Sequence, residues 1–210
     1  PVRQGLLNHT VTKEEAIRSF GLNPEKKTIL VIGGSLGART LNESMLAHLD
    51  EIAESGVQFI WQTGKYYFEK DEKRLHEKGD YPMIHITDFI SSMECAYSAA
   101  DLIISRAGAG SISEFCLLEK PVILVPSPNV AEDHQTKNAL ALVNKGAALY
   151  VKDSEATETL IETAINTVKD TEKLTDLSKN ISKLAFAHSA DTIADEVIKL
   201  AEQYKKEHGC

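Results

Sequence analysis

Short apolar runs alternate along the chain with longer segments whose apolar residues recur at helical spacing. Residues 28–32 are β-branched or apolar throughout, as expected of a strand that both faces of a parallel sheet bury. In residues 40–53, Leu41, Met45 and Leu49 recur at helical spacing and predict one helix. The remaining apolar runs predict five further strands, at residues 57–62, 83–86, 102–105, 121–125 and 147–151.

Helices are predicted between these strands and after the last of them. Thr12 and Glu15 form a capping-box pattern, which predicts a helix over residues 13–20 that ends at Gly21. The other predicted helices cover residues 66–78, 91–100, about 135–145, about 155–168, 171–187 and 190–206. Strands that alternate with helices predict an α/β fold with a Rossmann-like, doubly wound parallel sheet and additional C-terminal helices.

Composition narrows the class of protein. With 210 residues, 42% of them hydrophobic, the chain can form one large globular domain over residues 1–210. A net charge of -8 without any basic run argues against a nucleic-acid partner. The longest apolar runs are far shorter than the roughly 20 residues of a membrane span, and no signal peptide is recognisable.

The cysteines and the first residues add two expectations. Cys95, Cys116 and Cys210 have neither metal-ligand nor redox spacing, which fits a reducing cytoplasm and predicts no metal site. The chain starts at Pro1 without a methionine. We therefore expect the C-terminal part of a longer protein, with residues 1–11 as the remnant of a hinge or linker.

The stretch from Leu102 to Glu114 is predicted as a strand, a tight turn and the start of a helix. Small residues from Ala107 to Ser111 leave backbone N–H groups uncovered, and a helix is predicted to begin near Ser111. Free amides at the positive end of a helix form an anion site, and diphosphate is a common ligand of such sites. The alternative is an ordinary turn in which glycine serves only close packing.

The position of this turn in the predicted sheet favours a binding site. Ligands of parallel α/β sheets bind beyond the carboxyl ends of the strands. The loops at Gly33, Phe89, Gly108 and Pro126 all follow predicted strands, so they should gather at one edge of the sheet.

The glycine-rich loop at residues 33–37 matches neither of two common nucleotide motifs. Its glycine spacing is not that of the dinucleotide fingerprint, and Gln62, Thr63 and Gly64 follow the next strand where an acidic residue would be required. A P-loop is excluded because Arg39 stands where the motif needs serine or threonine after lysine. What remains is a second turn that is compatible with an anion.

Two further groups of polar residues each allow two interpretations. Glu114 is either a charge that favours the helix dipole or a carboxylate that accepts hydrogen bonds from vicinal ribose hydroxyls. His134, Gln135 and Asn138 either contact a ligand or are solvated at the start of a helix that Asp133 caps. No Ser–His–Asp or Cys–His arrangement can be proposed from the spacing.

Five motifs occur together in the order found in the MurG family, the GT-B glycosyltransferases that transfer N-acetylglucosamine from UDP to lipid I in bacterial peptidoglycan synthesis. They are PVR at residues 1–3, GGSLGAR at 33–39, DFI at 88–90, SRAGAGSISE at 105–114 and DHQTKNA at 133–139. The resemblance covers nearly the whole chain. It implies the C-terminal, donor-binding half of a GT-B fold.

By this resemblance, UDP-N-acetylglucosamine is the ligand, and its uracil, ribose and diphosphate have separate binding residues. The backbone at Phe89 and Ile90 would read the uracil edge, and Glu114 would accept the ribose hydroxyls. The diphosphate would be held by Ser35 and by the turn amides of Ala109, Gly110 and Ser111.

The resemblance also assigns the sugar. His134 and Gln135 would bind the hydroxyls that distinguish N-acetylglucosamine, with Arg3 and Asn138 as additional donor contacts. Many members of the family have glutamine where this chain has Leu36, and some have a glutamine pair at 134 and 135. These two departures bear on donor selectivity.

The family is inverting: the acceptor hydroxyl attacks the sugar opposite the departing UDP, and no cofactor or metal is expected. Its acceptor loops, general base and membrane-docking surface belong to the N-terminal half. We therefore expect this chain to bind donor without turnover, with helix 190–206 able to contact the other half. The intact enzyme is expected on the cytoplasmic face of the inner membrane. The alternatives are a separate binding subunit, as in the split transferase of the dolichol pathway, and a related UDP-sugar enzyme or epimerase.

Overall fold

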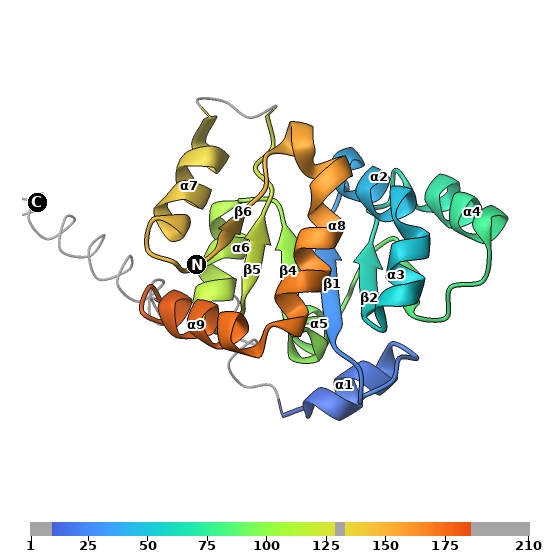
Figure 1. The fold of residues 1–210 in the computed structure, drawn as a ribbon, viewed down its shortest axis with the longest axis horizontal. Helices are drawn as coiled ribbons and strands as arrows, with labels where there is room; N and C mark the ends of the chain where they lie inside the picture. Colours follow the sequence, from blue (N-terminus) through green and yellow to red (C-terminus); the bar gives the residue numbers. More distant parts are fainter. Residues whose placement is uncertain (1–9, 129–132, 186–210) are drawn as a thin grey trace, which may run out of the picture.

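A parallel sheet with helices on both faces forms the frame of the molecule. The computed structural model describes residues 10–128 and 133–185, and within these ranges six parallel strands pair in the order β3-β2-β1-β4-β5-β6 (Figure 1). The strands are β1 (Thr28–Ile32), β2 (Gln58–Gln62), β3 (Ile84–Thr87), β4 (Leu102–Ser105), β5 (Val122–Leu124) and β6 (Leu149–Tyr150). The predicted Rossmann-like fold class is confirmed.

Two hydrophobic clusters separate the helices into layers. The first cluster joins the sheet to α2 (Arg39–Ala47), α3 (Leu49–Ser55), α4 (Phe68–Lys78) and α8 (Asp153–Lys169), with α8 lying across β1 and β4 in Figure 1. The second joins it to α1 (Lys13–Ser19), α5 (Met93–Ala99), α6 (Ala109–Leu117) and α7 (His134–Val143). Helix α9 (Thr171–Ser182) contributes Leu174 to the first cluster and Ile181 to the second.

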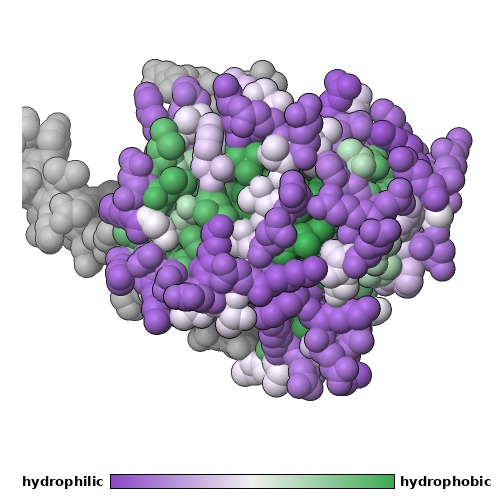
Figure 2. All heavy atoms as spheres, viewed as in Figure 1, coloured by the Kyte–Doolittle hydropathy of each residue, from purple (hydrophilic) through white to green (hydrophobic). Residues whose placement is uncertain are grey.

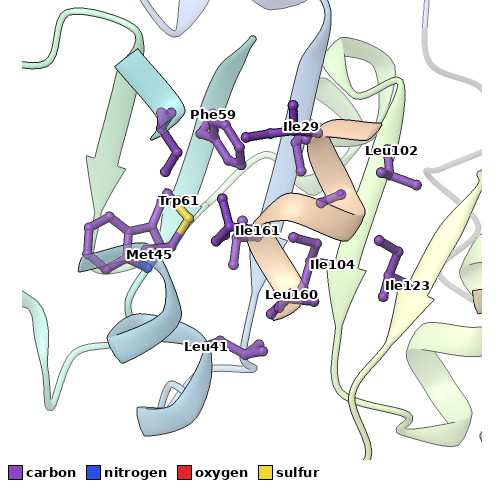
Figure 3. Close-up of a cluster of buried hydrophobic side chains, with 14 of the residues drawn as sticks. Ile29, Leu41, Met45, Phe59, Trp61, Leu102, Ile104, Ile123, Leu160 and Ile161 are labelled. Carbon is purple, nitrogen blue, oxygen red and sulfur yellow. The ribbon is translucent and has the colours of Figure 1, made fainter. Parts of the chain in front are cut away.

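The side chains of the first cluster interlock around the central strands. Figure 3 shows Phe59 and Trp61 of β2 beside Met45 of α2, with Ile161 of α8 close by. The Trp61 Nε1 donates to Asn42 Oδ1 at 3.0 Å, and the Asn42 Nδ2 donates to the Thr63 carbonyl at 3.0 Å. These two bonds connect α2 to β2 and to the loop that leaves its carboxyl end.

The surface is ordinary for a globular domain. Hydrophilic side chains cover most of the face in Figure 2, with apolar ones in the gaps between them. Within the described ranges, no helix combines the length and the apolar character that crossing a membrane requires.

Most helix boundaries lie within two or three residues of the sequence prediction, but two predicted helices differ clearly. The helix predicted over 171–187 ends at Ser182, where Lys183 is the C-cap. The capping box at Thr12 and Glu15 is present. The single helix predicted over 40–53 is wrong, because His48 leaves the helical conformation (φ -120°, ψ 27°) and separates α2 from α3. The His48 ring bonds to Glu51 Oε2 and to the Thr157 carbonyl of α8, each at 2.8 Å, and these contacts stabilise the break. The predicted helix 190–206 and residues 1–9 lie outside the described residues.

Two glycines bring the loops after β1 and β2 into direct contact. Gly37 (φ +81°) and Gly64 (φ +85°) both adopt the left-handed region that favours glycine. A Cβ on Gly37 would overlap the Thr63 carbonyl oxygen, and a Cβ on Gly64 would overlap the backbone of Gly37. The glycine-rich loop at residues 33–37 is therefore held against its neighbour by backbone packing.

Candidate functional site

A cleft of about 910 Å³ opens at the carboxyl edge of the sheet. Its lining includes residues from the loops that follow β1, β3, β4 and β5, among them Gly33, Phe89, Gly108 and Ser127. The predicted gathering of these loops at one edge is confirmed. The volume lies in the range of sites that bind small molecules and cofactors.

The turn between β4 and α6 presents backbone amides to this cleft. Helix α6 begins at Ala109 with Gly108 as its N-cap, two residues before the predicted start near Ser111. The Ile112 N–H makes the bond to the Gly108 carbonyl, at 3.0 Å, so the amides of residues 109–111 precede it. A Cβ on Gly108 or Gly110 would meet no protein atom within 4 Å. These glycines leave room in front of the helix end, which packing alone does not explain.

Glu114 lies one turn further along α6 and is 9% exposed. Its Oε2 accepts a hydrogen bond of 2.7 Å from the hydroxyl of Tyr97 in α5, and both side chains line the cleft. A nearly buried carboxylate beside the amides at a helix start gives the cleft both an acceptor and an anion-binding surface. The sequence indicates Glu114 as a site residue, whereas Tyr97 is indistinguishable from a core aromatic along the chain.

Residues of two other loops complete this side of the cleft. Phe89 is 48% exposed and Ile90 is 5% exposed, and both line the cleft. The Phe89 carbonyl accepts a bond of 3.1 Å from the Thr87 hydroxyl, and Lys65 Nζ lies 5.6 Å from the Phe89 ring centroid. The backbone at Phe89 is thereby fixed at the edge of the cleft.

In the loop after β1, Ser35, the residue predicted to hold the diphosphate, is exposed and lines the cleft. The neighbouring Leu36 is 77% exposed and also lines the cleft. An apolar side chain therefore stands at the mouth of the site.

Of the residues predicted to bind the sugar, Gln135 lines the cleft, whereas His134 and Asn138 do not. Gln135 lines the cleft, and its Oε1 accepts the backbone N–H groups of Ser127, at 2.9 Å, and Ala107, at 3.3 Å. Asn138 Nδ2 donates to the Ala107 carbonyl at 3.2 Å. These bonds tie the loop after β5 and α7 to the loop after β4.

The other residues of this group lie differently. Within the described part of the chain, His134 and Asn138 are not among the residues that line the cleft, and neither is Ala109, which was predicted to hold the diphosphate. Asp133 has a left-handed backbone (φ 52°) and makes no side-chain cap bond to α7, so the alternative in which it caps that helix is wrong. Arg3 lies outside the described residues.

An ion pair that the sequence did not indicate supports the base of the cleft. Arg106, at the end of β4, donates to Asp153 Oδ1 in the first turn of α8, and the same Nη1 donates to the Val125 carbonyl at 3.0 Å. Thr40 of α2 donates to Asp153 Oδ2 at 3.1 Å. Arg106 and Asp153 are 47 residues apart, so spacing gives no sign of the pair.

In the part of the chain that the structure describes, no cluster of side chains forms a metal site. There, no three His, Cys, Asp or Glu side chains lie together as metal ligands would. The charged side chains that line the cleft are Arg39, Arg106, Asp153 and the nearly buried Glu114, beside backbone amides and hydroxyls.

Residues 28–196 match the model of the glycosyltransferase family 28 C-terminal domain. The chain belongs to this family. The match extends from β1 through α9, so it includes every cleft loop described above. The cleft residues therefore all lie within the part of the chain that matches the family model.

Individual relatives agree with this assignment. The chain is 68% identical, over 100% of its length, to the UDP-N-acetylglucosamine--N-acetylmuramyl-(pentapeptide) pyrophosphoryl-undecaprenol N-acetylglucosamine transferase of Phocaeicola vulgatus. It is 63% identical, over 97% of its length, to the protein of the same name from Bacteroides fragilis. The alignments cover 56% and 54% of those proteins, so this family 28 domain spans about half the length of the relatives it matches.

A solved structure supports the fold of the family 28 domain directly. The crystal structure of Acinetobacter baumannii MurG superimposes with a TM-score of 0.72 at 27% identity, covering 90% of this chain and 53% of that one. The resemblance to the MurG family is therefore confirmed for the C-terminal domain.

Proposed function

We propose that this chain is the donor-binding half of an N-acetylglucosaminyltransferase and that its cleft binds UDP-N-acetylglucosamine. The observation that carries the proposal is the position of Glu114, a nearly buried carboxylate one turn behind the amides at the start of α6. Amides and a helix N-terminus suit a diphosphate, and a carboxylate suits a vicinal diol. A nucleoside diphosphate carries both groups.

The remaining cleft residues have proposed roles that follow the shape of this ligand. The amides of Gly110 and Ser111, together with Ser35, hold the diphosphate, and Glu114 accepts the ribose hydroxyls. Ala109, which does not line the cleft, is retained as a diphosphate contact on the resemblance alone. The backbone at Phe89 and Ile90 contacts the uracil edge. Because Gln135 Oε1 already accepts two backbone N–H groups, its Nε2 is the atom we assign to a sugar hydroxyl.

His134 and Asn138 lie outside the cleft lining. His134 is exposed and would need a ligand that extends beyond the cleft lining, whereas Asn138 acts through the Ala107 carbonyl. Arg3 is retained as a proposed donor contact on the resemblance alone.

For the whole enzyme, we propose transfer of N-acetylglucosamine to lipid I, which produces lipid II for peptidoglycan. The acceptor hydroxyl attacks the anomeric carbon, the bond to the diphosphate breaks, and negative charge grows on the departing UDP. The amides at the start of α6 stabilise that charge. The base, the lipid I site and attachment to the cytoplasmic membrane surface are assigned to the half of the relatives that this chain does not match, and no cofactor is proposed.

Calorimetric titration of the chain tests the donor assignment. UDP and UDP-N-acetylglucosamine should bind, and UDP-N-acetylgalactosamine, the C4 epimer, should bind more weakly because its hydroxyl no longer meets the sugar contacts. Equal affinity for the two epimers would remove the roles of His134 and Gln135. No binding of UDP would refute the proposed function.

A further inference from the structure

We infer that Tyr97 is the positioning residue that orients the Glu114 carboxylate and thereby sets the preference of the cleft for a ribose diol. This inference rests on the proposed function, because it concerns the ribose part of the same site. The residue that would touch the ligand is Glu114, and Tyr97 acts through it.

The contact between the two residues is short and nearly buried. The Tyr97 hydroxyl donates to Glu114 Oε2 at 2.7 Å, and the two residues are 2% and 9% exposed. Hydrogen bonds to an ionised carboxylate are stronger than neutral ones, and more so away from water. Both residues line the cleft, so this bond lies at the ligand surface and not in a remote part of the core.

The tyrosine ring is itself fixed by packing. It meets the Phe115 ring edge to face, with centroids 5.9 Å apart and an interplanar angle of 87°. Ala96 and Ala99 of the same helix are fully buried in the second hydrophobic cluster, which anchors α5. The hydroxyl is therefore presented from a rigid element.

The consequence for Glu114 concerns rotation of its carboxylate. The last torsion of a glutamate side chain is broad, so packing alone does not fix the plane of the two oxygens. A donor on Oε2 restricts that plane. Two vicinal hydroxyls can bind one carboxylate together only if its oxygens face them, so the restriction lowers the entropy lost on binding a diol.

The same helix also connects the ribose and base parts of the site. Helix α5 begins three residues after Ile90, and Ile90 and Tyr97 pack in the same hydrophobic cluster. Movement of α5 would therefore displace the base-contacting backbone and the ribose carboxylate together.

The test is Tyr97→Phe, which removes one hydroxyl and keeps the ring contact with Phe115. Calorimetry would compare UDP with 2′,3′-dideoxy-UDP, which offers no ribose hydroxyl to Glu114. We expect the variant to lose up to about tenfold in UDP affinity, as for the ordering of one more side chain on binding, and to bind the dideoxy ligand like the wild type. Tyr81→Phe is the matched control, since Tyr81 is half-buried and does not line the cleft.

Two other results would overturn the inference. Equal losses for UDP and for the dideoxy ligand would show a purely structural role, and unchanged UDP affinity would show no role. In a Glu114→Ala background, Tyr97→Phe should have no further effect on UDP binding, because the two residues act as one unit. If the wild-type chain bound neither ligand, the proposed function would fail first and independently of Tyr97.

Discussion

Arg106 and Asp153 join the end of the central strand β4 to the first turn of α8. Their side chains are 16% and 20% exposed, and Arg106 also donates to the carbonyls of Val125 and Pro126. We expect Arg106→Ala to lower the free energy of unfolding by about 1.5–3 kcal/mol, because it leaves a carboxylate and two carbonyls without this donor. Urea unfolding followed by circular dichroism measures the change.

Asp153→Asn tests the other member of the same ion pair. Its amide oxygen can still accept from Arg106 or Thr40, so the loss should be clearly smaller than for Arg106→Ala. Equal stability of wild type and Arg106→Ala would show that the pair does not support the cleft.

Glu114→Ala should bind UDP about 1.5–3 kcal/mol more weakly, because a charged hydrogen-bonding partner is lost. Glu114→Gln keeps the size and one acceptor oxygen, so it separates loss of charge from loss of volume. Thermal unfolding of both variants checks that α6 remains folded. Wild-type UDP affinity in Glu114→Ala would refute the ribose role.

Two glycines on the cleft should respond to alanine in opposite ways. At Gly108 the added methyl meets no protein atom and φ is -71°, so Gly108→Ala should unfold at the wild-type temperature but bind UDP more weakly. At Gly37 the methyl overlaps the Thr63 carbonyl oxygen and φ is +81°, so Gly37→Ala should lose about 2 kcal/mol or more of stability. Differential scanning calorimetry with and without UDP measures both. A marked loss of stability in Gly108→Ala would contradict the open space in front of the turn.

Asp101 is expected to make the free energy of unfolding depend on pH. Burial opposes its ionisation, but bonds from Lys13 and the Thr28 N–H outweigh burial and hold the pKa of Asp101 below its usual value. A carboxylate whose pKa is lowered by folding stabilises the folded state at pH values above its unfolded pKa of about 4. This contribution to stability is lost as pH falls through the folded-state pKa. Asp101→Asn should therefore be less stable at pH 7, and the difference from wild type should shrink in unfolding curves measured below about pH 4.

Asp71 should behave in the opposite sense. Burial raises its pKa, with Glu43 adding to the effect, and its buried Oδ2 makes no hydrogen bond within the described residues. The folded state then holds its proton more tightly than the unfolded state, so this residue costs stability as pH rises above about 4. Asp71→Asn should be more stable than wild type at pH 7 and no more stable below pH 4. Lower stability at pH 7 would show that the Arg74 pair outweighs burial.

The sheet could be predicted closely because each strand is an apolar run with a local signal. β1 and β4 have the predicted bounds, and Thr12 with Glu15 marks the start of α1 through neighbouring residues alone. The break at His48 could not be predicted in this way. It is stabilised by the Thr157 carbonyl, 109 residues away in the sequence.

The sequence predicts which loops form the cleft, but it does not predict which pairs of side chains bond to each other there. Parallel strands bring their carboxyl ends together, which places Gly33, Phe89 and Gly108 around one space. The bonds from Tyr97 to Glu114 and from Arg106 to Asp153 could not be predicted from the sequence. A tyrosine considered alone suggests a core residue, and a charged side chain considered alone suggests a surface residue. Gln135, predicted as a sugar contact, lines the cleft, but that its carbonyl oxygen binds two backbone amides could be known only from the folded chain.

The direct packing of Gly37 on Gly64 limits how this cleft can be altered. Neither loop tolerates a larger residue at the contact, and neither can be lengthened there without displacing the other. Efforts to redirect the site to a different nucleotide sugar should therefore leave these two loops unchanged. Libraries would be better placed at Ser127 and Gln135, which also line the cleft and whose mutual contact is a bond from a backbone N–H to a side-chain oxygen.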